Sequence, residues 1–170
     1  MNAETRRKKI LERLSVAAGP VSATALAGTF SVSRQVIVGD IALLRASGAD
    51  ITATPRGYIL AKEQVGLTRT VAVKHTMEQT EQELCIFVDH GCTVEDVIVE
   101  HHIYGQLVGT LQLSSRYDVS QFMDRLHKGG ASALSSLTDG IHLHTLRCPD
   151  EAAFERACAE LKQAELLLND

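Results

Sequence analysis

The order of short periodic segments in the first sixty or so residues is the feature that most restricts the fold. Apolar side chains recur at helical spacing over residues 5–18, until Gly19-Pro20 ends the segment. Two further helices are predicted over about 22–29 and 34–47, with Ser22 and Ser33 as their N-caps. The chain is therefore expected to open with three closely spaced short helices.

A short hairpin is predicted after the third helix. Gly48 stands where a left-handed C-cap is expected, and two β-prone runs, 50–54 and 58–60, flank the turn Pro55-Arg56-Gly57. Three helices and a hairpin are the layout of a winged helix-turn-helix. Residues 1–62 are therefore predicted to form a DNA-binding domain.

The charge distribution supports this prediction. Residues 1–62 contain nine Lys and Arg against four Asp and Glu, whereas residues 63–170 contain eight against seventeen. The net charge of −4 therefore hides a basic front part and an acidic rear part. This split is expected when only the front part meets a polyanion such as DNA.

The start of the third helix supplies the residues predicted to read operator DNA. Arginine suits the guanine edge and glutamine the adenine edge in the major groove. Arg56, at the hairpin tip, is predicted to reach the backbone or the minor groove, and the basic run 6–9 adds non-specific attraction. The alternative is that the polar residues only solvate a helix face. The residues predicted to face outward are Ser33, Arg34, Gln35 and Val38.

A second domain of mixed pattern is predicted over residues 70–170, after a polar linker at 61–69. The order β-α-β-β-α-β-α predicts an α+β fold, with an antiparallel or mixed sheet and helices mainly on one face. The predicted strands cover 70–75, 94–100, 103–113 and 141–146, and the predicted helices cover 80–89, 119–128 and 150–168.

Several classes of protein are excluded by composition. No run approaches the roughly 20 apolar residues of a membrane span, and the chain begins with a charged helical pattern instead of an apolar signal sequence. The four cysteines form no CxxC pair, so neither a disulfide scaffold nor a thiolate zinc site is expected. A cytoplasmic protein with no membrane partner is predicted.

The histidines of the rear domain suggest a metal site. His142 and His144 are two residues apart on a predicted strand, so both imidazoles point to one face. His75 ends the first strand and Glu83 lies in the first turn of the next helix, where they could complete a three-histidine, one-carboxylate site for zinc or nickel. The alternative is that Thr80-x-x-Glu83 is a capping box.

Sequence motifs in both halves resemble the 3H-domain repressors, the niacin-responsive regulators of NAD precursor genes. The front half carries SVSRQVIVGDIALLRASGADITATPRGYIL, and the rear half carries KHTMEQTEQEL, VEHHIYG, SRYDV and GIHLHT in that family's order. The resemblance implies an HPr-like sensor domain, a homodimer, nicotinic acid as corepressor and a divalent metal. It also places His75, Glu83, His142 and His144 at the family's metal-binding positions.

Two further residues are candidates for holding the effector. His101 matches the remaining histidine of the family, and it is expected either in the effector pocket or beside the metal ligands. Nicotinate offers a pyridine nitrogen for an open metal position and a carboxylate that would bind a guanidinium. Arg116, between a strand and a helix, is the predicted partner of that carboxylate, although an ion pair with Asp118 is the alternative.

Three functions are compatible with these sequence features. The first is a nicotinate-responsive repressor of genes for NAD precursor synthesis or salvage. The second is a metal-responsive regulator with no organic effector, which the same histidines would serve. The third, a metal-dependent enzyme, is disfavoured because neither Asp89 nor Glu100 stands out as a general base near the histidine pair.

Overall fold

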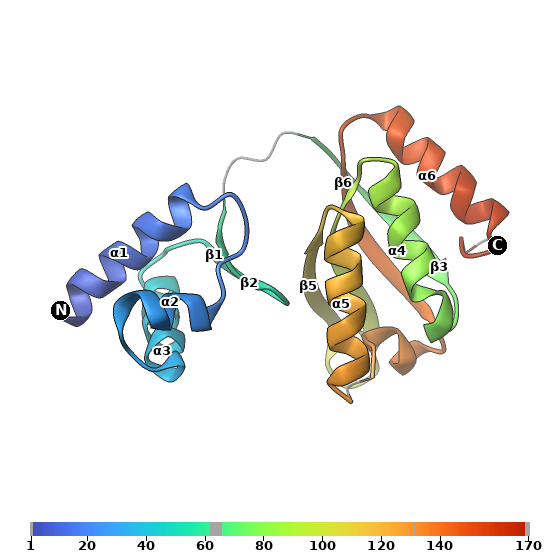
Figure 1. The fold of residues 1–170 in the computed structure, drawn as a ribbon. Helices are drawn as coiled ribbons and strands as arrows, with labels where there is room; N and C mark the ends of the chain where they lie inside the picture. Colours follow the sequence, from blue (N-terminus) through green and yellow to red (C-terminus); the bar gives the residue numbers. More distant parts are fainter. Residues whose placement is uncertain (1, 62–65, 131, 169–170) are drawn as a thin grey trace. The chain divides into compact units, whose positions relative to one another are not determined.

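The computed structural model describes residues 2–61, 66–130 and 132–168. The chain divides into two compact units, Met1–Glu63 and Gln64–Asp170, and each contains its own hydrophobic core (Figure 1). The predicted domain boundary at residue 62 and residues 62–65 of the predicted linker lie outside the described residues. No helix in the described part of the chain is long and apolar enough to cross a membrane.

The N-terminal unit contains the three predicted helices and the predicted hairpin. Both predicted N-caps are formed, because the hydroxyl of Ser22 accepts from the amide of Ala25 and that of Ser33 from the amide of Val36. Gly48 follows the third helix with a φ of +95°, as expected of a left-handed cap. The elements are α1 (Ala3–Val16), α2 (Ala23–Phe30), α3 (Arg34–Ala46), β1 (Ile51–Thr54) and β2 (Gly57–Leu60).

The wing is attached to the helices by a short backbone bridge. Val21 and Tyr58 exchange two main-chain hydrogen bonds of 2.9 Å. Gly57, with a φ of +139°, makes this approach possible, because a Cβ atom there would lie 2.4 Å from the carbonyl carbon and oxygen of Val21. The apolar stripes of the helices close over one core, formed by Ile10, Leu14, Ala23, Leu26, Ala27, Ile37, Ile41, Leu44 and Ile51.

The C-terminal unit has the predicted order β-α-β-β-α-β-α. Its four strands form one antiparallel sheet in the order β3-β6-β4-β5, and Figure 1 shows α4 and α5 over the same face of that sheet. Two 3₁₀ turns, Met77–Gln79 and Leu134–Thr138, join the main elements. These are β3 (Leu67–Lys74), α4 (Thr80–Asp89), β4 (Thr93–His101), β5 (Gly105–Leu113), α5 (Arg116–Lys128), β6 (Ile141–Cys148) and α6 (Glu151–Gln163).

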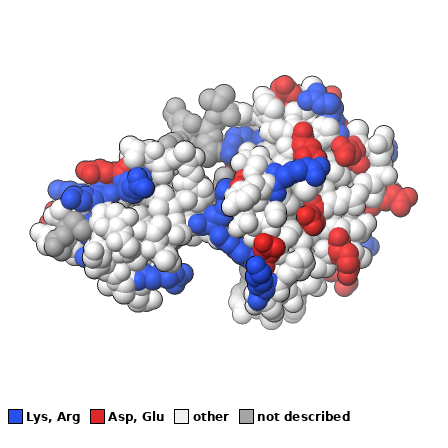
Figure 2. Space-filling model, viewed as in Figure 1, with Lys and Arg blue, Asp and Glu red and all other residues white. Residues whose placement is uncertain are grey.

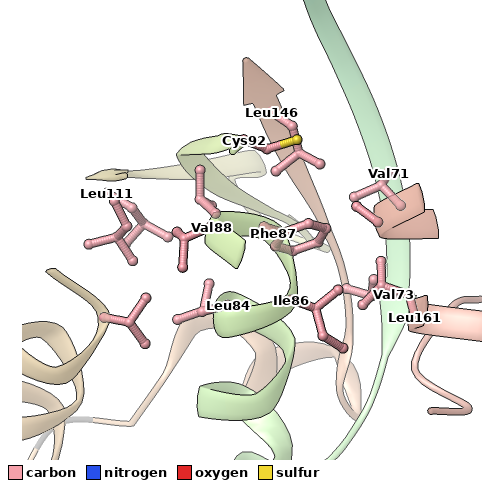
Figure 3. Packing of buried hydrophobic residues seen from close by; sticks show 14 of the residues in the cluster. Val71, Val73, Leu84, Ile86, Phe87, Val88, Cys92, Leu111, Leu146 and Leu161 are labelled. Atoms are coloured by element: carbon pink, nitrogen blue, oxygen red, sulfur yellow. The ribbon is translucent and has the colours of Figure 1, made fainter. Parts of the chain in front are cut away.

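The core of the C-terminal unit lies between the sheet and its helices. Figure 3 shows Phe87 of α4 among apolar side chains from β3, β6 and the neighbouring helices, and its ring is fully buried. Burial of such a side chain contributes about 1.5–3 kcal/mol. Alternate residues of β6 face this layer, so His142, His144, Leu146 and Cys148 are buried together. The sheet therefore directs two histidines into an otherwise apolar interior.

Several element boundaries differ from the predicted ones, and β5 begins at Gly105 instead of residue 103 because residues 102–104 form a turn. The last helix ends at Gln163 instead of residue 168, because Glu165 adopts a φ of +57° and the chain becomes extended. The carbonyl of Leu166 then accepts from the amide of Lys74, and Leu166 is fully buried. Tertiary pairing with β3 thus replaces the helical continuation. Likewise, β3 begins at Leu67 within the predicted linker, and α5 begins at Arg116 because Ser115 caps it.

Replacement of Gly57 by alanine is expected to destabilise the N-terminal unit by about 1–3 kcal/mol, because the new Cβ collides with backbone and the residue keeps a positive φ. Gly28→Ala is the matched control. It adds a methyl group to α2 with nothing within 4 Å and should stabilise the unit by about 0.5–1 kcal/mol. Native-state hydrogen exchange of the α1–α3 amides separates this unit from the other. Equal protection in both variants would contradict the assignment.

Candidate metal centre and DNA-binding surface

The residues predicted to read DNA lie at the exposed start of α3. Arg34 and Gln35 are exposed and Val38 is half-buried. The hydroxyl of Ser33 caps the helix by accepting from the amide of Val36. Arg56 is half-buried in the turn between β1 and β2. The helix terminus and the wing therefore present the predicted residue types, and the buried stripe of α3 faces the core.

Two residues of the basic run have a structural partner. Asp40, on the inner side of α3, is only 4% exposed and receives both the Nε (2.5 Å) and an Nη (3.2 Å) of Arg6. Arg7 approaches the same carboxylate at 3.6 Å. The predicted role of the run in non-specific attraction therefore falls to Lys8 and Lys9, which are exposed. Sequence reasoning missed Asp40, whose only signal was an acidic residue on the apolar side of a helix.

Acidic side chains are distributed unevenly over the surface. On the face shown in Figure 2, most of them lie over the C-terminal unit, as the charge split of the sequence predicts. This pattern keeps the acidic surface off the unit that carries the helix-turn-helix.

A buried carboxylate with three histidines around it is the most unusual feature of the C-terminal unit. Glu83, in the first turns of α4, is fully buried. The Nε2 atoms of His75 and His142 lie 2.7 and 3.5 Å from its Oε2, and the Nε2 of His144 lies 3.2 Å from its Oε1. All three histidines are at most 8% exposed. The four predicted ligands are therefore brought together.

Hydrogen bonds to the backbone determine which nitrogen each histidine offers. The Nδ1 atoms of His75, His142 and His144 lie 2.8, 2.9 and 2.6 Å from the carbonyl oxygens of Thr76, Gly140 and Asp96. A carbonyl can only accept, so each Nδ1 carries a hydrogen and donates it. A neutral imidazole held in this way directs an Nε2 lone pair toward Glu83, whereas a protonated one donates to it, as the 2.7 Å contact between His75 Nε2 and Glu83 Oε2 allows.

When the histidines are neutral, their Nε2 lone pairs face the carboxylate oxygens of Glu83, so acceptors face acceptors. The Oε1 of Glu83 and the Nε2 of His144 are both buried without a hydrogen-bond partner. Buried acceptors that face one another require either added protons or a cation between them. Ligand atoms of His75, Glu83 and His142 lie within 4.8 Å of one another, so this group could hold a metal ion. The orphaned atoms and the donor types fit a divalent transition metal.

The electrostatics point the same way. Burial alone lowers the pKa of His75 and His144, but the hydrogen bonds and the charge of Glu83 outweigh it and raise the pKa of both. Burial alone raises the pKa of Glu83, but the charge of His144 and the histidine hydrogen bonds hold that pKa well below its ordinary value. The site therefore favours a carboxylate surrounded by positive charge.

A glycine that sequence reasoning missed brings the two sides of the cluster together. Gly140 precedes β6 with a φ of +87°, and a Cβ atom there would lie 2.2 Å from the carbonyl oxygen of His75. Antiparallel pairing of β3 with β6 places Val73 opposite His142 and Val71 opposite His144. The end of β3 and the start of β6 can therefore close around Glu83 only with glycine at this position.

The capping-box alternative for Glu83 is excluded by the structure. The capping box before α4 is formed by Thr76 and Gln79, and the carboxylate of Glu83 points to the histidines. A carboxylate in the first turn of a helix can either cap the helix or point into the interior. The full burial of Glu83 among the histidines shows that it does the latter.

The two predicted effector residues lie apart from the cluster. Arg116 forms a two-pronged ion pair with Asp89 (2.7 and 2.5 Å), and it lines a separate surface hollow. The Nδ1 of His101 accepts from the amides of Ile103 and Tyr104 in the β4–β5 turn.

The cavity beside the cluster is lined by other residues. Its volume is about 680 Å³, and His75 is the residue that it shares with the cluster. The remaining lining includes Lys74, Thr76, Met77, Gln79, Ser135 and Ser136. An ammonium group, hydroxyls and an apolar thioether therefore line a cavity next to His75, one of the candidate metal ligands.

Arg34→Ala is expected to weaken operator binding by about 1–3 kcal/mol while leaving the unfolding of the N-terminal unit unchanged, because the side chain is exposed. Arg6→Ala should instead destabilise that unit, because it leaves Asp40 buried without its main partner. Fluorescence anisotropy on an operator selected from random DNA, together with calorimetry, distinguishes the two. A weaker operator complex of a fully stable Arg6→Ala protein would contradict this division.

The stability of the metal-free C-terminal unit is expected to fall as the pH rises above neutrality. His75 and His144 have raised pKa values, so their contribution is complete below about pH 6.5 and is lost at higher pH. Glu83 has a lowered pKa, so its contribution is present above about pH 4.5 and is lost only in acid. Calorimetry in the presence of a chelator measures this slope. Glu83→Gln should flatten it, and an unchanged slope would refute the pairing.

Comparison with known proteins agrees with this geometry. Residues 6–59 match the HTH domain family, and residues 68–170 match the 3H domain family. The chain is 44% identical to the probable transcription repressor NiaR of Thermotoga maritima, over 98% of this chain and 95% of that protein. It is 42% identical to the transcription repressor NadR of Bacillus subtilis, over 97% and 94%.

These relatives are repressors and not enzymes, which agrees with the exposed recognition helix and with the predicted absence of catalysis. The matches together span nearly the whole chain and cover both compact units. The chain therefore belongs to the 3H-domain family of helix-turn-helix transcription repressors.

Proposed function

We propose that this repressor takes nicotinic acid as corepressor at a metal in its C-terminal unit and controls genes for the synthesis or salvage of NAD precursors. It acts in the cytoplasm as a homodimer, so that two recognition helices meet two operator half-sites. Operator contacts come from Ser33, Arg34, Gln35, Val38 and Arg56. The observation that carries the proposal is the buried Glu83 cluster, which lies beside a cavity that His75 also lines.

The metal would be held by the Nε2 atoms of His75, His142 and His144 and by the carboxylate of Glu83. Imidazole nitrogens with one carboxylate suit nickel or zinc. When bound, such an ion supplies a Lewis-acid position for a ligand nitrogen. The backbone carbonyls of Thr76, Gly140 and Asp96 keep each Nδ1 protonated and each Nε2 ready for the ion.

The cavity offers groups of the kind that nicotinate needs. Lys74 supplies a positive charge for the carboxylate, Ser135 and Ser136 supply hydroxyls, and Met77 supplies an apolar wall for the flat ring. Arg116 and His101 were the first candidates for effector contact, but each lies in a different hollow. The geometry therefore favours Lys74 as the partner of the carboxylate.

Corepression requires that nicotinate binds the DNA-bound state more tightly than the free state. By linkage, the operator then tightens nicotinate binding by the same factor. The 3₁₀ turn Leu134–Thr138 lines the cavity and contacts both β4 and β6, so it is placed to respond to an occupant.

Titration of the nickel-loaded protein with nicotinate should show binding that His142→Ala abolishes or weakens by about 100-fold, because a metal ligand is lost. His90→Ala, which removes a surface histidine paired with Glu160, is the matched control. Lys74→Met should weaken binding by about 10-fold, whereas Arg116→Met should not. The opposite ranking would return the carboxylate to Arg116.

Anisotropy on the selected operator tests the regulatory part of the proposal. Operator affinity should rise with nicotinate only in the metal-loaded protein, and nicotinamide serves as the uncharged comparison. If operator affinity follows the metal and ignores millimolar nicotinate, the chain is a metal-responsive regulator with no organic effector.

A further inference from the structure

One edge of the C-terminal sheet is covered and the other is not. The outer edge of β3 is paired by the chain's own C-terminal segment, where the carbonyl of Leu166 accepts from Lys74 and the amide of Leu168 donates to Ala72. At the other edge, β5 pairs with β4 alone within the described part of the chain (Figure 1). Every second residue of such an edge strand directs its N–H and C=O groups outward.

The composition of β5 leaves this edge without the usual protection. Natural edge strands are kept apart by charged side chains, proline or short length. The strand Gly105–Leu113, with the sequence GQLVGTLQL, contains neither a charge nor a proline, and its one irregularity against β4, a bulge with Gln112 at a φ of +55°, lies near its C-terminal end. The outward-facing N–H and C=O groups of such an uncharged edge can bond to an added strand in place of water.

The same sequence reads almost identically in both directions from Gly109. Leucines occupy positions 107 and 111, glutamines occupy 106 and 112, and the β-branched residues Val108 and Thr110 flank the glycine. Two-fold pairing of antiparallel strands about Gly109 would therefore place like side chains opposite like over Leu107–Leu111, and the bulge at Gln112 ends this regular stretch. An isologous interface requires a surface that is complementary to itself, and this strand has that property. Because the strand carries no charge, two copies of it do not repel one another.

Exposed apolar side chains gather at the same edge. Val108, in the middle of the strand, is 57% exposed, and Ile103 and Tyr104 of the preceding turn are 69% and 72% exposed. Tyr117, at the start of α5 directly after β5, is 69% exposed. Stable interfaces bury about 1,200–2,000 Å² in total, which is more than a strand pair alone supplies.

We infer that two copies of the chain join through β5, with Gly109 at the two-fold axis, to form one continuous eight-stranded sheet. In this register Leu107 of one copy lies opposite Leu111 of the partner subunit. The turn residues Ile103 and Tyr104 then extend toward the partner's Tyr117 and enlarge the buried area. This inference rests on the homodimer of the proposed function and specifies the surface through which it forms. A homodimer joined through another surface would leave the proposed function intact.

Val108→Lys tests the interface in the full-length protein. Two lysines close to the axis would repel, so sedimentation velocity should show the dimer dissociation constant raised by about 100-fold or more. Thr70→Lys adds the same charge at an exposed position of β3 and should leave the dimer intact. Circular dichroism of both variants checks the fold. A Val108→Lys protein that stays dimeric, or a wild-type protein that is monomeric at micromolar concentration, would overturn the inference.

Cross-linking tests the register independently of stability. The double variant Val108→Cys/Thr110→Cys should form a covalent dimer on mild copper–phenanthroline oxidation, because opposite residues of antiparallel strands lie within disulfide reach. Thr68→Cys/Thr70→Cys has the same spacing on β3 and should not. Equal cross-linking of both, or of neither, counts against β5 as the interface.

The nicotinate response separates this inference from the proposed function. A Val108→Lys dimer that still answers to nicotinate would overturn the β5 interface and leave the function standing. A wild-type dimer broken by Val108→Lys but indifferent to nicotinate would support the interface and remove the function.

Discussion

The C-terminal unit is organised around a fully buried carboxylate that faces three imidazole nitrogens. Because each Nδ1 donates to a backbone carbonyl, the Nε2 atoms reach Glu83 as acceptors unless they take up protons. A buried site of this kind is costly without added positive charge. Whatever supplies that charge, protons or a divalent ion, therefore governs the stability of the unit.

The rest of the unit serves to hold these groups in place. Antiparallel pairing of β3 and β6 places His75, directly after β3, beside His142 and His144 of β6, and Gly140 allows the two strand ends to approach. Phe87, one turn after Glu83 on α4, packs with its ring edge to His144 and anchors the helix in the apolar core. The N-terminal unit uses a smaller version of the same device, since Asp40 is buried on α3 and held by Arg6. In both units a buried acid is made tolerable by a specific partner.

Local sequence patterns were sufficient to predict most elements of the fold and part of the candidate metal site. Helical spacing and the serine caps were sufficient to predict α1 to α3, and alternating patterns predicted the order of the C-terminal elements. The pair His142 and His144 was predictable because alternate residues of a strand share a face. Boundaries set by distant contacts were not predictable. The end of α6 depends on the pairing of Leu166 with β3, and no local signal announces that pairing.

The sequence by itself determined the winged helix, the α+β fold of the C-terminal domain and the candidate metal ligands, because these follow from periodicity, capping and residue type over short spans. The tertiary structure decided which neighbours each charged group meets. In the folded chain Arg116 pairs with Asp89, Arg6 pairs with Asp40, and Lys74 lines the cavity beside His75. These pairings join residues far apart in the chain, and only the packing of whole elements against one another selects among the many partners that a charge could take.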